Sequence, residues 1–129
     1  MKLKICGLNP KRDVQLCIDL KVNYLGFVFY NKSPRNVDLE EVKILSKYDK
    51  INSSFVAVTV NPTNEFIKEN LSKNFDYIQL HGSESAERVN EIQKMGFKVI
   101  KAIKVQNEQD IDRYKDYGNS DIILFDTPG

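Results

Sequence analysis

The sequence is short of cysteine and histidine, and it has no long apolar stretch. Cys6 and Cys17 are its two cysteines and His81 is its single histidine, and their spacing does not match a zinc site. The sequence contains neither an 18-residue apolar run that would indicate a membrane span nor the apolar start of a secretion signal. These absences favour a cytoplasmic protein in which both thiols are free.

The chain also lacks an excess of charge of either sign. Its 19 Lys and Arg against 18 Asp and Glu leave a net charge of +1, which is too small to attract nucleic acid or an anionic membrane. An anionic ligand would therefore have to be bound by local groups. With 129 residues, 41% of them hydrophobic and 29% charged, the chain has the composition of one globular domain and is shorter than the ~250 residues of a closed eight-stranded α/β barrel.

Strand and helix patterns alternate along the whole chain. Apolar runs predict six strands, and amphipathic or capped segments predict five helices between them. The expected strands are 3–6, 24–29, 54–60, 77–80, 98–103 and 121–125, and the expected helices are 10–20, 38–47, 63–71, 84–95 and 107–117. This α/β alternation is typical of right-handed crossovers in a parallel sheet. It does not distinguish an open doubly wound sheet from an incomplete barrel.

Capping residues precede most of the expected helices. Asn9-Pro10 and Asn61-Pro62 each offer an N-cap side chain followed by a proline at the first helical position, and the repetition indicates a repeated βα unit. Asp38 and Ser83 are expected to cap two further helices. Cys17 is expected to be a small buried residue on an apolar helix face.

Reactive side chains stand at the ends of several expected strands. Cys6 ends the first strand, and Asp126 ends the sixth, whose apolar run 122–125 predicts burial on both faces. Loops after the strands build the pocket in parallel α/β folds, so the thiol and the carboxylate are expected to face one cavity. Arg35 and His81 lie in loops at the same rim, where an arginine can pair with a carboxylate or phosphate. A solvated or structural role is the open alternative for both.

Five segments, taken together, resemble phosphoribosylanthranilate isomerase, a family of tryptophan biosynthesis. They occur in the family's order along the whole chain, at Lys4–Leu8, Gly26–Val37, Phe55–Asn61, Gln79–Glu84 and Leu124–Asp126. The resemblance implies a TIM-barrel fold of parallel (β/α) units forming a single domain over 1–129. It also implies a cofactor-free Amadori rearrangement of N-(5′-phosphoribosyl)anthranilate to 1-(2-carboxyphenylamino)-1-deoxyribulose 5-phosphate.

The resemblance further implies a role for each rim residue. Cys6 takes the place of the family's general base, and Asp126 takes that of its general acid. Arg35 is similar to the arginine that contacts the anthranilate carboxylate, and His81 matches the rim histidine after strand 4, a second substrate-binding position. The expected partner is a phosphorylated small molecule.

The family pattern is incomplete at the C-terminus, where strands 7 and 8 have no counterpart before Gly129. We therefore expect an incomplete barrel with weak or no turnover, whose phosphate-binding residues belong to the absent region. Open sheet edges at 3–5 and 122–125 predict self-association. The alternatives are a non-catalytic truncated α/β module that self-associates and a phosphoryl-accepting receiver domain. The receiver is disfavoured because Cys6-Gly7 and Val60-Asn61 stand where it needs acidic residues.

Overall fold

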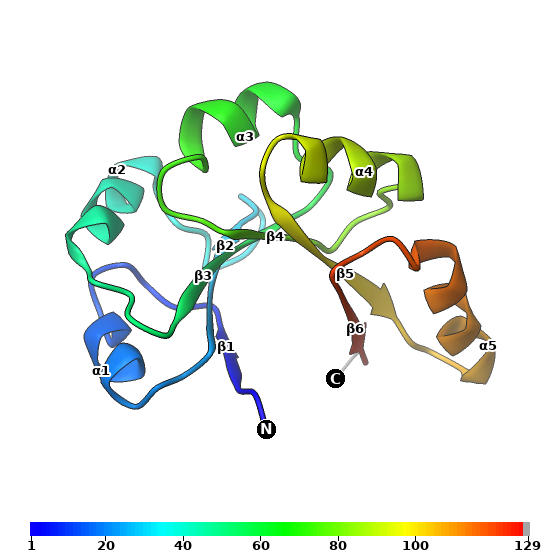
Figure 1. Cartoon of the computed structure of the whole chain (residues 1–129), viewed down its shortest axis with the longest axis horizontal. Helices are drawn as coiled ribbons and strands as arrows, with labels where there is room; N and C mark the ends of the chain where they lie inside the picture. Colours follow the sequence, from blue (N-terminus) through cyan, green and yellow to red (C-terminus); the bar gives the residue numbers. More distant parts are fainter. Residues whose placement is uncertain (128–129) are drawn as a thin grey trace.

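A single parallel sheet with helices between its strands accounts for residues 1–127, which are those that the computed structural model describes (Figure 1). Pro128 and Gly129, at the end of the segment that begins with Asp121, lie outside the described residues. The strands pair in chain order and comprise β1 (Lys4–Cys6), β2 (Tyr24–Phe29), β3 (Ser54–Thr59), β4 (Tyr77–Leu80), β5 (Lys98–Lys104) and β6 (Ile122–Asp126). Each expected strand is present, with bounds within one residue of those predicted.

The five expected helices are also present, and they lie along the outside of a strongly curled sheet (Figure 1). The N-terminus and β6 lie on its open side. The curl identifies an incomplete barrel, since a doubly wound sheet would carry helices on both faces. No helix of residues 1–127 is long and apolar enough to cross a membrane. The helices are α1 (Val14–Asp19), α2 (Leu39–Val42), α3 (Asn64–Asn70), α4 (Ala86–Lys94) and α5 (Glu108–Ile111), with 3₁₀ segments Lys43–Lys47 and Asp112–Tyr117 extending α2 and α5.

Asp38 caps α2 as predicted, but the caps predicted for three other helices are wrong. The Asn9 side chain accepts a hydrogen bond from a backbone amide two residues later, which makes a turn, and α1 begins only after this turn. Asn61 has a left-handed backbone with φ 45°, and the Thr63 hydroxyl caps α3 in its place. The cap of α4 is Ser85 rather than a residue two positions earlier, Ser83. Asn and Ser side chains stabilise turns as well as helix ends, so the local pattern did not separate the two.

Side chains alternate between the two faces of the curled sheet, as the pleat of a strand requires. The convex face packs under the helices and forms the larger core, in which the rings of Phe27 and Phe55 meet Phe75 from the α3–β4 connection. The concave face carries a smaller apolar cluster formed by strand residues alone. This concave cluster consists of Val28, Val56, Val58 and Ile100, with Tyr24, Tyr77, Ile122 and Leu124 packed against it.

Strand β6 is less buried than its apolar sequence predicted. Phe125 is 49% exposed, and residues 122–124 are only partly buried. Within residues 1–127, β6 pairs with β5 alone and is an edge of the sheet. Because Leu124 packs on the concave cluster, Phe125 points to the convex face. The expectation of burial on both faces was wrong, because among the described residues no helix follows β6 to cover the face on which Phe125 lies.

Candidate active site

The alternation of the strands brings Cys6, His81 and Asp126 to the concave face at one end of the sheet. Each lies at or just after the C-terminal end of its strand. Asp126 is two positions beyond Leu124 and His81 is four positions beyond Tyr77, and both of these reference residues pack on the concave cluster. Side chains at even spacings along a strand share a face. The rim predicted from the sequence is therefore present.

A cavity of about 330 Å³ opens at this rim, near the lower end of the roughly 300–1,000 Å³ range of small-molecule pockets. Cys6, Arg35 and His81 line it, together with Lys104 from the end of β5. Asp126 reaches the cavity through His81, whose Nε2 lies 3.1 Å from its Oδ2. The sequence predicted that the thiol and the carboxylate face one cavity. Cys6 lines this cavity, whereas Asp126 is connected to it through its hydrogen bond with His81.

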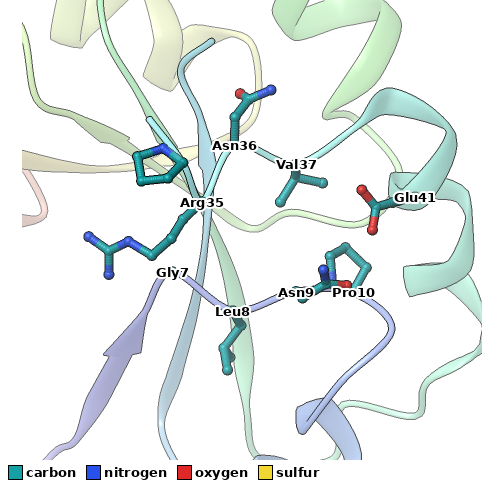
Figure 2. Close-up of a pocket in the computed structure, with 9 residues that line it drawn as sticks. Gly7, Leu8, Asn9, Pro10, Arg35, Asn36, Val37 and Glu41 are labelled. Carbon is teal, nitrogen blue, oxygen red and sulfur yellow. The ribbon is translucent and has the colours of Figure 1, made fainter. Parts of the chain in front are cut away.

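Arg35 is held over the end of β1 by the loop that follows β2. The loop closes through the Val37 amide, which donates to the carbonyl of Val28 at 2.8 Å. Gly7, with φ +85°, makes room for the guanidinium, since a Cβ at this position would lie 2.5 Å from Arg35 Nη1. Figure 2 shows the Arg35 side chain extending over Gly7 and away from Glu41. Arg35 therefore lines two cavities. One is a small cavity between the loop after β1 and the loop after β2, and the other is the larger cavity at the rim.

Gly26 lies beside the Cys6 thiol. The two residues pair in the register of β1 and β2. A Cβ on Gly26 would lie 3.3 Å from Cys6 Cα and 3.4 Å from its Sγ. The Gly7 and Leu8 amides that follow both donate to the Gly26 carbonyl at 3.0 Å. Close contact between β1 and β2 thus fixes the position of the thiol.

His81 forms a hydrogen bond at each ring nitrogen, and the one to Asp126 links β4 to β6. Its Nε2 lies 3.1 Å from Asp126 Oδ2, and its Nδ1 lies 3.2 Å from Nε2 of Gln79. An amide nitrogen can only donate, so Nδ1 accepts and Nε2 carries the ring proton. His81 therefore donates its Nε2–H to the Asp126 carboxylate.

A buried ion pair holds the loop that carries His81. The Lys101 and Glu84 side chains are each 1% exposed, and their Nζ and Oε1 atoms are 3.0 Å apart. Lys101 also donates to the Gly82 carbonyl at 2.9 Å. The Glu84 carboxylate accepts from the amides of Gly82 at 2.9 Å and Asn61 at 2.7 Å. These bonds join the loop after β4 to β5 and to the loop after β3.

The two cysteines lie in contrasting surroundings. Cys17 is 5% exposed and belongs to the core under the helices, as predicted for a small buried residue. Burial, and to a lesser extent the Asp13 carboxylate, raises the pKa of the Cys17 thiol. Cys6 is exposed at the rim cavity. Of the two thiols, Cys6 is the one placed to act on a ligand.

Three further residues support the site, although the sequence predicted no role for them. They are Gln79, Glu84 and Lys101. Gln79 and Glu84 stand in the same segment as His81, yet nothing in that segment identifies their partners. Lys101 was visible as a charged residue with buried apolar neighbours on both sides. A lysine is rarely fully buried unless it is paired, so this position indicated a buried acid, which lies 17 residues earlier in the chain.

Comparisons with known proteins point to one family. Residues 3–129 match the family model described as N-(5′-phosphoribosyl)anthranilate (PRA) isomerase. A protein of that name from Sulfurihydrogenibium sp. is 40% identical over 124 residues, which are 96% of this chain and 59% of that protein. Another from Parabacteroides distasonis is 34% identical over 98% of this chain and 59% of that protein. The chain therefore spans about 59% of the length of the curated relatives it matches.

Comparison with solved structures points to the same family. The crystal structure of a phosphoribosyl anthranilate isomerase in complex with reduced 1-(o-carboxyphenylamino)-1-deoxyribulose 5-phosphate matches with a TM-score of 0.86 and 33% identity. The match covers 99% of this chain and 66% of that chain. Both the sequence and the arrangement of strands and helices therefore place the chain beside the same proteins.

Proposed function

This chain belongs to the N-(5′-phosphoribosyl)anthranilate isomerase family, and from that membership we propose that it carries the acid–base half of the isomerase active site. The proposed reaction is the Amadori rearrangement of N-(5′-phosphoribosyl)anthranilate to 1-(2-carboxyphenylamino)-1-deoxyribulose 5-phosphate in tryptophan biosynthesis. The observation that supports it is the rim cavity, where Cys6, Arg35 and His81 converge and Asp126 is bonded to His81.

In this proposal Asp126 is the general acid and Cys6 the general base. Asp126 gives a proton to the ribose ring oxygen, the bond from that oxygen to C1′ breaks, and the nitrogen lone pair forms an iminium with C1′. The iminium acidifies the hydrogen on C2′, which the Cys6 thiolate removes to leave an enaminol. Gain of a proton at C1′ and loss of one from the C2′ hydroxyl then give the ketone. Atoms and electrons balance within the substrate, so the reaction needs no cofactor.

Arg35 is proposed to bind the anthranilate carboxylate. A planar guanidinium matches a carboxylate with two parallel hydrogen bonds and does not exchange protons at neutral pH. Its place over Gly7, on the cavity that Cys6 also lines, would hold the aromatic end of the substrate near the base. His81, which lines the same cavity, is proposed to contact the substrate while it orients Asp126.

The proposed partner is a phosphorylated small molecule, and the proposed location is the cytoplasm. The net charge of +1 gives no reason to add nucleic acid or a membrane as a partner.

Self-association is part of the proposal. In the described part of the chain β1 pairs with β2 alone and β6 with β5 alone, and unpaired strand edges favour pairing with further chains. Light scattering should show a mass above that of the monomer, and a strictly monomeric chain at high concentration would contradict this.

The test of function is an isomerase assay of residues 1–129, alone and with a separately expressed fragment that supplies the remaining length of a family member. We expect negligible turnover by the chain alone, because a misplacement of ~1 Å can cost on the order of a hundredfold in rate, and turnover when the fragment is added. Robust turnover by the monomeric chain alone would show that six strands suffice.

Variants in the complemented assay test the individual roles. Cys6→Ala and Asp126→Asn should depress kcat, whereas Arg35→Ala should mainly raise KM. Cys17→Ala, the same change at a buried thiol away from the cavity, is the control for Cys6→Ala. An unchanged kcat in Cys6→Ala would show that Cys6 is not the general base. If Arg35→Ala lost turnover at saturating substrate and kept its KM, Arg35 would not have the proposed role in binding.

A further inference from the structure

Gln79 places a buried amide in an apolar part of the sheet. It is 2% exposed and lies between Val58 and Ile100 in the register of β3, β4 and β5. Its Nε2 is 3.2 Å from His81 Nδ1, and its Oε1 has no hydrogen-bond partner in the described part of the chain. Burying a polar group without full pairing is unfavourable. The cost suggests that the contact of this amide with His81 serves the site.

The His81–Asp126 pair can take up one further proton in two ways. The proton can reside on Nδ1, which makes an imidazolium facing a carboxylate, or on Asp126, which makes a carboxylic acid beside a neutral imidazole. The groups around the pair decide which member holds the proton. The Gln79 N–H is directed at Nδ1, and a proton on that nitrogen would have to face another donor.

We propose that Gln79 is a positioning residue that keeps His81 singly protonated, so that a proton added to the His81–Asp126 pair resides on Asp126. Its consequence for catalysis rests on the proposed function, because a general acid must itself hold the proton that it gives to the ribose oxygen. The placement of the proton rests on the hydrogen bonds alone.

Other groups around His81 act alongside Gln79. The titratable or charged side chains that bond to it or line the same cavity, from four different parts of the fold, are Cys6, Tyr30, Arg35, Lys104 and Asp126. The two cations among them, Arg35 and Lys104, oppose a positive charge on the ring, and the Asp126 carboxylate favours one. A substitution at Gln79 leaves all of these groups in place, so it isolates the contribution of the amide.

The experiment follows the imidazole nitrogens by NMR in residues 1–129. His81 is the single histidine, so every imidazole signal belongs to this ring. The unsubstituted chain should show the Nε2–H tautomer. In Gln79→Met the pH midpoint of the ring should rise by roughly half a pH unit or more, because removal of one opposing donor changes the balance by about one hydrogen bond. Gln15→Met, the same change at an exposed position on α1, should leave the midpoint unchanged.

The sign of the shift decides the proposal. A midpoint that is unchanged or lower in Gln79→Met, or an Nδ1–H tautomer in the unsubstituted chain, would overturn it, because the amide would then present its oxygen to the ring. Gln79→Leu removes the same donor with a different shape and repeats the test if Gln79→Met does not fold.

Turnover separates this inference from the proposed function. In the complemented assay Gln79→Met should lower kcat with little change in KM, since less of the proton resides on Asp126. A raised midpoint with no isomerase turnover in any form would support the proton placement and defeat the proposed function. Turnover with an unshifted midpoint would support the proposed function and defeat the role of Gln79.

Discussion

The buried Lys101–Glu84 pair should respond asymmetrically to the loss of either partner. In Glu84→Leu, the Lys101 ammonium keeps, among the described residues, the carbonyls of Gly82 at 2.9 Å and Leu80 at 3.5 Å and the face of a tyrosine ring. The two backbone amides that the carboxylate accepts from lose their partner as well. In Lys101→Met, by contrast, the carboxylate keeps both of those amides. The loss of Glu84 should therefore be the more damaging change.

The magnitude follows from the environment of the pair. Removing one partner of a buried ion pair costs about 3–5 kcal/mol, and both side chains are 1% exposed. We expect Glu84→Leu near the upper end, because an uncompensated charge and two orphaned amides remain, and Lys101→Met near the lower end. The exposed pair Lys43–Glu40, with side chains 74% and 79% exposed, supplies the control. Glu40→Gln should cost less than about 0.5 kcal/mol.

Urea unfolding measures these differences as changes in the free energy of unfolding. The chain has no tryptophan, so circular dichroism is the suitable probe. The double variant Glu84→Leu/Lys101→Met should be more stable than the sum of the single effects predicts, since neither charge is then left buried alone. If Lys101→Met destabilised the chain as much as Glu84→Leu, the assignment of the two amides to the carboxylate would be wrong.

Three further predictions follow from the site and the sheet. Brief iodoacetamide treatment should label exposed Cys6 before buried Cys17, whose raised pKa also disfavours the thiolate. Equal labelling of the two cysteines in mass mapping would contradict the assignment of Cys6 as the base. In the complemented assay Gly7→Ala should raise KM more than it lowers kcat, because the new Cβ would displace Arg35; an unchanged KM would show that the guanidinium does not depend on this gap. Burial, followed by interactions with a neighbouring tyrosine and two aspartates, raises the pKa of Tyr77 to about 12, against about 10 in an unfolded chain. The stability linked to the neutral phenol is thus fully present below about pH 10 and lost as the pH rises toward 12, and Tyr77→Phe should flatten this loss in urea unfolding across that range.

The sequence by itself determined the strands and the rim. Runs such as 24–29 and 77–80 carry their own β-branched and apolar pattern, so their bounds were predicted as they are observed. A strand end and an alternating face are local properties. For that reason Cys6, His81 and Asp126 were placed at one end of the sheet before any contact was known. The segments around them also identified the family.

Helix starts were less predictable because their capping groups had competing partners. Asn61 resembled a cap, but its Oδ1 accepts from the Ser83 amide in the loop after β4, and its own amide donates to Glu84. Those partners lie more than 20 residues away in sequence, and no local pattern contains them. The same limit applied to β6, whose burial depends on neighbours and not on its apolar sequence.

Only the tertiary structure decided which side chains meet. His81 and Asp126 are 45 residues apart and sit on strands separated by β5, so their contact depends on the curl of the sheet. Gln79 acquires a role only because His81 lies beside it, and Arg35 extends over the end of β1 only because Gly7 leaves space. Sequence patterns specify the face and the end of each strand, but pairing across a curved sheet depends on distances that the folded chain alone sets.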